Sequence, residues 1–121
     1  MTGFDYFVNY LQEEGYRFKD EGSFISFKYQ GTTYLSPKND SSFLQVLMMW
    51  NVENYDKMKI LEACNTVNSN KFVVKCIMMD NDSVWVSYES EPSVHTTTED
   101  FDTMMQILEH SSQEFMQELN K

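Results

Sequence analysis

The chain has 121 residues, of which 41% are hydrophobic and 15% aromatic. This length is typical of one domain, and the aromatic content is too high for a disordered chain, so we expect a single ordered domain spanning residues 1–121. Its 19 acidic and 9 basic residues give a net charge of −10, which would repel the phosphates of nucleic acid. The simplest role of this charge is to keep the domain dissolved, and the alternative is to steer a basic segment of a partner toward it.

The N-terminus, the apolar runs and the cysteines bear on where the protein works. Met1 to Tyr6 contain no cationic cluster followed by an apolar core, and no later run approaches the roughly 20 apolar residues of a membrane span. We therefore expect a cytoplasmic protein with no signal peptide and no membrane contact. Cys64 and Cys76 lie in apolar patterns without Cys-x-x-Cys spacing, which favours buried free thiols over a disulfide.

The first 35 residues predict a short amphipathic helix and a set of hairpin strands. Thr2 is a suitable N-cap, and Gly15 stands where a helix-terminal glycine is expected. The apolar residues between them follow helical spacing, at Phe4, Phe7, Val8 and Leu11. The turn at Gln30-Gly31 separates two alternating segments and predicts a hairpin. The expected strands are residues 16–19, 24–29 and 32–35.

The middle of the chain predicts a covered strand and a second helix. After a loop at residues 36–42, residues 43–50 are almost continuously apolar, which is typical of a strand in a central position. Asn51 or Asn54 is a suitable cap for the next helix, which we expect to pack on the sheet and to end at residues 65–68. Its expected apolar stripe consists of Tyr55, Met58, Leu61, Ala63, Cys64 and Val67.

The last third predicts another hairpin and a final helix. Strand-like residues 71–79 and 83–89 flank a polar tip, and Thr97 or Thr98 begins the helix with an approximate capping box. The apolar positions of that helix are Phe101, Met104, Met105, Leu108, Phe115 and Leu119. With three or four strands in the first group, the order α-β-β-β-α-β-β-α predicts an α+β fold, a two-layer α/β sandwich with a mostly antiparallel sheet.

Three features of the central region point to a family. Asn65 and Asn68 end the middle helix, a strand begins at Lys71-Phe72-Val73, and a hairpin tip stands at Met79-Asp80-Asn81-Asp82. With the order of elements, they resemble the YbjN-like family of bacterial domains, which shares the fold of the type III secretion chaperones. The resemblance implies a small α/β sandwich that binds other proteins, often as a homodimer, as a secretion-type chaperone or in sensory transduction. It supplies no catalytic residues.

No constellation in the sequence indicates an enzyme, a metal site or a cofactor. His95 and His110 have no cysteine at zinc-site spacing, and no Gly-x-Ser-x-Gly elbow accompanies them. The tip at residues 80–82 is better explained as a turn than as a calcium loop, because Trp85 stands where an EF-hand needs its glycine. The four glycines form no phosphate-binding loop. We therefore expect no catalytic residues, no metal and no cofactor.

Methionines and aromatic residues mark the best candidate for a binding surface. The nine methionines include three adjacent pairs, at 48–49, 78–79 and 104–105, and two neighbours cannot both point into one core layer. Aromatic residues on the strands raise the same difficulty. We therefore predict a partner or dimer surface formed by Trp50, Trp85, Tyr88, Met104 and Met105. The alternative is that the methionines simply fill the core.

Two classes of function follow from these patterns. The first is a non-catalytic protein-binding module, chaperone-like or regulatory, that binds a protein partner or a second copy of itself as a homodimer. The second is a small-molecule or peptide-sensing domain of bacterial signal transduction, whose pocket would draw on Asn65, Asn68 and His95. A flat apolar surface would favour the first class, and a closed pocket with convergent polar groups would favour the second.

Overall fold

The computed structural model describes residues 1–71 and 73–121. The described elements follow the predicted order, with four strands in the first group. They are α1 (Gly3–Glu13), β1 (Phe18–Asp20), β2 (Phe24–Tyr29), β3 (Thr32–Pro37), β4 (Leu44–Asn51), α2 (Lys57–Asn70), β5 (Val74–Met78), β6 (Ser83–Ser90) and α3 (Thr98–Leu119). The strand predicted from Lys71 is shorter than expected at its start, and Phe72 lies outside the described residues.

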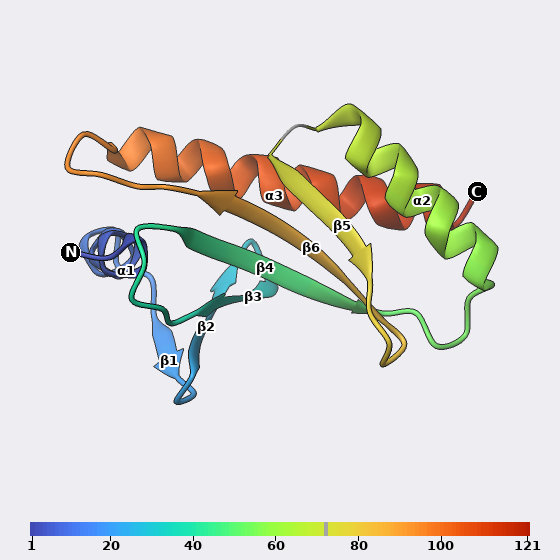
Figure 1. Ribbon diagram of the computed structural model, residues 1–121, viewed down its shortest axis with the longest axis horizontal. Helices are drawn as coiled ribbons and strands as arrows, with labels where there is room; N and C mark the ends of the chain where they lie inside the picture. Colours follow the sequence, from blue (N-terminus) through green and yellow to red (C-terminus); the bar gives the residue numbers. More distant parts are fainter. Residues whose placement is uncertain (72) are drawn as a thin grey trace.

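The six strands form one antiparallel sheet in the order β1-β2-β3-β4-β6-β5. β4 lies between β3 and β6, so the central position predicted for residues 43–50 is confirmed. Figure 1 shows α3 running along most of the length of the molecule, with α1 beside its start and α2 beside its C-terminal half. The fold is therefore α+β, with a layer of helices on a mostly antiparallel sheet, as predicted.

All three helices pack on the same face of the sheet. Phe7 of α1 contacts Phe27, with ring centroids 5.4 Å apart. Cys64 of α2 contacts Cys76, and α3 reaches Trp50. Strand alternation and the register place these three strand residues on one face. We name the opposite face, which no described helix covers, the open face.

The caps explain where the helices begin. The Thr2 side chain accepts from the Asp5 N–H, and the Asp5 carboxylate accepts from the Thr2 N–H, which completes a capping box for α1. Thr97 and Asp100 do the same for α3, so both predicted starts are confirmed. The predicted cap of α2 is wrong: Asp56, rather than Asn51 or Asn54, accepts from the Lys59 N–H.

The predicted apolar stripe of α2 is confirmed in its second half, at Ala63, Cys64 and Val67, and is wrong in its first half. The buried residues are Ile60, Ala63, Cys64 and Val67, which follow helical spacing from the observed first turn. Tyr55, Met58 and Leu61, expected in the apolar stripe, are 37%, 62% and 40% exposed instead. The helix also continues to Asn70, past its predicted end. In α3, by contrast, every predicted apolar position is buried.

The two cysteines are buried free thiols, as predicted, and they lie against each other. The Cys76 thiol donates to the Cys64 sulfur across 3.4 Å, which joins β5 to α2. This hydrogen bond, together with burial, raises the pKa of Cys76. Among the described residues, no helix has the length and apolar character needed to cross a membrane.

Candidate binding surface on the open face of the sheet

A row of three large apolar side chains crosses the open face. Trp85 on β6 lies directly opposite Met49 on β4 and Ile77 on β5, so the three side chains are neighbours on one face. Met49 is 46% exposed and Ile77 is 48% exposed, while Trp85 is half-buried between them. We name this row the apolar row. It is the largest group of exposed apolar side chains that the register brings together.

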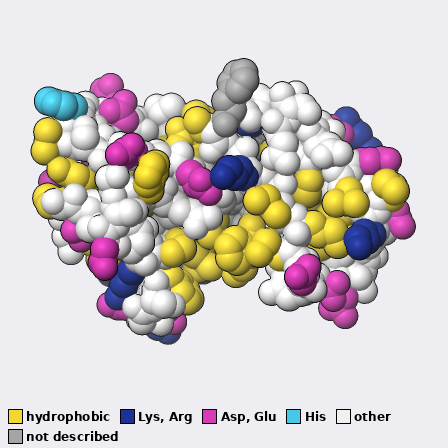
Figure 2. Space-filling view, in the orientation of Figure 1, with side chains coloured by type: hydrophobic (Ala, Val, Ile, Leu, Met, Phe, Trp, Pro, Cys, Tyr) yellow, Lys and Arg dark blue, Asp and Glu magenta, His cyan; other side chains and the backbone are white. Residues whose placement is uncertain are grey.

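A second row extends this surface toward β3. Leu47 pairs with Leu35 on β3 and with Ser87 on β6, and Ser87 pairs with Lys75. Leu47 is only 2% exposed although no helix covers it, because neighbouring side chains on the open face enclose it. Figure 2 shows the exposed part of this surface as a yellow band across the middle of the molecule, in the region of β4, β5 and β6. The surface is apolar at its centre.

Cations lie beside the apolar centre, on β1 and β2. Lys19 lies opposite Ser26, and Lys28 lies opposite Thr33. With Arg17 they line a hollow of about 490 Å³. On the far side of the sheet's centre, Lys75 of β5 forms an ion pair with Glu89 at 3.1 Å. The open face is therefore apolar in the middle and cationic at one end.

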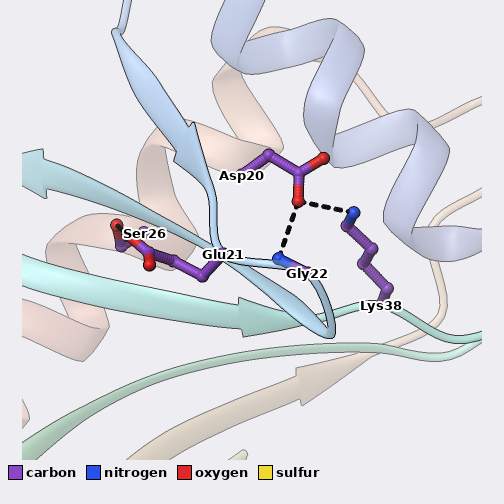
Figure 3. Close-up of polar contacts among 5 residues, drawn as sticks. All are labelled: Asp20, Glu21, Gly22, Ser26 and Lys38. Carbon is purple, nitrogen blue, oxygen red and sulfur yellow. Dashed lines mark hydrogen bonds and ion pairs between the residues drawn. The ribbon is translucent and has the colours of Figure 1, made fainter.

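The two carboxylates at the end of β1, Asp20 and Glu21, bind groups of neighbouring residues in the same chain. Asp20 accepts from the Gly22 N–H at 2.9 Å and from the Lys38 ammonium at 2.8 Å, as Figure 3 shows. The Lys38 contact and the Gly22 N–H lower the pKa of Asp20. Glu21 accepts from the Ser26 hydroxyl at 3.4 Å and lies 3.6 Å from the Lys19 ammonium. Neither carboxylate is within ion-pair distance of Arg17 or Lys28.

The two tryptophans of the predicted surface lie on opposite faces, so that part of the prediction is wrong. Trp50 is paired with Val84, whereas Trp85 is paired with Met49, and neighbours along a strand alternate between faces. The Trp50 indole N–H donates to the Ser112 hydroxyl on α3 at 3.0 Å, which fixes it beneath the helix. Of the two, only Trp85 belongs to the open face.

The predicted methionines do not contribute to any surface either. Met104 is 3% exposed and Met105 is 1% exposed, because the apolar stripe of α3 is wide enough to bury two consecutive residues against the sheet. Tyr88 lies on the helix-covered face and lines, with Met104, a small hollow of about 200 Å³ at the start of α3. Burial raises the pKa of Tyr88.

Met49 and Ile77 are the surface residues that the sequence argument missed. A signal for them was present: residues 44–50 and 73–79 are apolar at both odd and even positions, so each strand must place apolar side chains on both faces. The alternation that normally separates core from surface was absent. Only the packing of the helices showed which positions remain uncovered.

The residues considered for a small-molecule pocket do not converge. His95 and Asn65 are exposed and lie in different elements. Asn68 instead holds β5: its amide oxygen accepts from the Cys76 N–H at 2.7 Å, and its amide nitrogen donates to the Cys76 carbonyl at 2.9 Å. Within the described ranges, no three His, Cys, Asp or Glu side chains are grouped so as to hold a metal ion.

Comparison with solved structures places the fold in a known class. The structure of YbjN from E. coli, described as a candidate transcription regulator, matches with a TM-score of 0.70 at 15% identity, over 97% of this chain and 89% of that chain. An uncharacterized protein from Methanothermobacter thermautotrophicus matches with a TM-score of 0.68 at 12% identity, over 98% and 96%. No family model and no curated protein matches the sequence. The chain has a YbjN-like fold, as its element order indicated.

Proposed function

We propose that this chain is a non-catalytic protein-binding module, chaperone-like or regulatory, whose partner covers the open face of the sheet. The observation that carries the proposal is the apolar row, which remains half-exposed while three helices fill the other face. Burying apolar surface stabilises a complex by about 25 cal/mol per Å² before association costs are counted. Tryptophan and methionine are also enriched at protein interfaces.

The shape of the surface supports a macromolecular partner over a small ligand. The apolar row is spread across three neighbouring strands, and the candidate pocket residues Asn65, Asn68 and His95 are separate from it and from one another. An exposed apolar area spread over three strands suits another protein, whereas small ligands are usually enclosed in a concave pocket. The homodimer implied by the family resemblance stays a prediction, which the mass of the complex in solution tests.

The experiment is affinity capture from a native cell lysate with a matched pair of variants. Ile77→Glu places a charge on the apolar row, and Met58→Glu places the same charge on α2 at a side chain that is 62% exposed. Both changes are on the surface, so we expect unfolding free energies within about 0.5 kcal/mol of the unmodified chain. A partner at a defined stoichiometry should be lost with Ile77→Glu and kept with Met58→Glu.

The capture is accompanied by light scattering of the purified protein, which detects a second copy as the partner. A mass of twice 14.3 kDa that falls to 14.3 kDa with Ile77→Glu would identify the homodimer. Equal retention of every partner by both variants would contradict the proposal, because the open face would then have no part in binding.

A further inference from the structure

The charge of the open face is opposite to that of the chain. The whole chain carries 19 acidic and 9 basic residues. Yet four of the nine cations are on the open face or at its β1 edge, namely Arg17, Lys19, Lys28 and Lys75. The carboxylates beside them are Glu21 and Glu89, and each already pairs with a lysine, Lys19 and Lys75 respectively. The face therefore has an excess of positive charge.

Two of these cations have no carboxylate partner among the residues that the structure describes. Among the described residues, no carboxylate lies within 4.0 Å of the Arg17 or Lys28 side-chain nitrogens. Both side chains are exposed and line the same hollow, next to the hydroxyl group of Thr33. An arginine donates two parallel hydrogen bonds to a carboxylate, and a lysine beside it adds a second positive charge. This end of the face is suited to carboxylate groups.

We propose that the open face binds an acidic, apolar segment of a protein partner, with its carboxylates at Arg17 and Lys28 and its apolar side chains on the apolar row. This inference rests on the proposed function and specifies the chemistry of the partner. Lys28 on β2 and Trp85 on β6 are three strand spacings apart in the sheet order, or about 15 Å. An extended segment of about five residues covers that distance.

A second copy of this chain does not meet the requirement through the same face. Glu21 and Glu89, the carboxylates that lie beside these cations, are both paired with lysines, so the same end of a second copy offers neither of them free to Arg17 or Lys28. Nucleic acid fits poorly as well, because its binding requires many neutralised phosphates, and Arg17 and Lys28 are the two cations of this face without a carboxylate partner among the described residues. The acidic protein segment is the occupant that satisfies both the charge and the apolar surface.

The test selects peptides from a random library on the immobilised full chain and measures the affinity of the enriched peptides by titration. We expect the enriched sequences to combine acidic and apolar residues. Arg17→Glu/Lys28→Glu should weaken their binding by about tenfold or more, and the effect should shrink at high salt. The matched control is Lys57→Glu/Lys59→Glu, which changes the net charge equally on α2 and should leave affinity within about twofold.

The possible results separate this inference from the proposed function. Enriched peptides that are apolar without acidic residues, or that bind the Arg17→Glu/Lys28→Glu variant equally well, would overturn the inference and leave the proposed function standing, provided that Ile77→Glu abolishes their binding. Displacement of the peptides by a single-stranded oligonucleotide at equal concentration would also overturn it, in favour of a general polyanion site. No enrichment at all would overturn the inference, and the lysate capture would then decide the proposed function.

Discussion

At the scale of single residues, a tyrosine hydroxyl joins α1 to the first turns of α3. Tyr10 on α1 donates to the Asp102 carboxylate on α3 at 2.6 Å, and its side chain is buried. Burial, then the hydrogen bond and the charge of Asp102, raises the pKa of Tyr10 far above its usual range. Burial likewise raises the pKa of Tyr34, whose hydroxyl has no partner among the described residues. Both tyrosines favour the folded state only while protonated.

Tyr10→Phe tests this contact at neutral and at alkaline pH. Removing a hydrogen bond to a charged group should lower the free energy of unfolding by about 2 kcal/mol at neutral pH. Because the pKa of Tyr10 is higher in the folded chain, its contribution is complete below about pH 10 and is lost as pH rises above that value. Urea unfolding should therefore show a shallower alkaline decline for the variant. An unchanged slope would mean that Tyr10 does not control it.

Asn68, expected from the sequence to end the middle helix, binds the backbone of the edge strand β5. Its amide pairs with both backbone groups of Cys76, an edge-strand residue that would otherwise lack these partners. Asn68→Ala should cost about 1–3 kcal/mol in urea unfolding, because two backbone groups lose their hydrogen bonds. Asn65→Ala, at an exposed position on the same helix, should cost less than about 0.5 kcal/mol. Equal losses would show that the amide does not hold β5.

At the scale of elements, α1 approaches the segment before β4 closely enough to require glycine. The Gly3 N–H donates to the Ser41 carbonyl at 3.2 Å. A Cβ atom at Gly3 would lie 2.9 Å from the Phe43 carbonyl carbon, and nearer still to the Ser42 carbonyl oxygen. These obstacles are backbone atoms, so they cannot move aside as a flexible side chain would. The first turn of the helix and this segment are fitted to each other.

Gly3→Ala should therefore destabilise the protein although alanine is the better helix former. We expect a loss of about 1–3 kcal/mol from the forced separation of α1 and the segment before β4. The measurement is thermal unfolding followed by circular dichroism, with Asn9→Ala on the exposed side of α1 as the control. A stabilised Gly3→Ala variant would show that the segment before β4 yields, and that helix propensity decides the sign.

At the scale of the whole molecule, the net charge of −10 opposes the compact state. The four ion pairs found among the described residues join exposed or partly exposed side chains, and such pairs contribute little. Raising NaCl from about 20 mM to about 300 mM should screen repulsion between carboxylates more than it weakens these pairs, so the melting temperature should rise. A fall in melting temperature would indicate that the surface ion pairs dominate.

The element order was predictable because helical and strand periodicities are local properties of the chain. The capping boxes at Thr2 and Thr97, the turn at Gln30-Gly31 and the buried stripe of α3 all follow from residues a few positions apart. The start of α2 was less clear because Asn51, Asn54 and Asp56 are all suitable caps within six positions. The stripe was also ambiguous at its start, because Met58, Ile60 and Leu61 are all apolar and only Ile60 continues the spacing of Ala63, Cys64 and Val67.

The sequence by itself determined the α+β class, the central position of β4 in the sheet and the burial of both cysteines. Only the tertiary structure decided which tryptophan is open to a partner, that Met104 and Met105 are core, and that Arg17 and Lys28 lie beside an apolar surface. The physical reason is that a strand apolar on both sides carries no local mark of its covered face. Which face of the strand is covered depends on where α1, α2 and α3 pack. Contacts such as that of Trp50 with Ser112 join residues 62 positions apart.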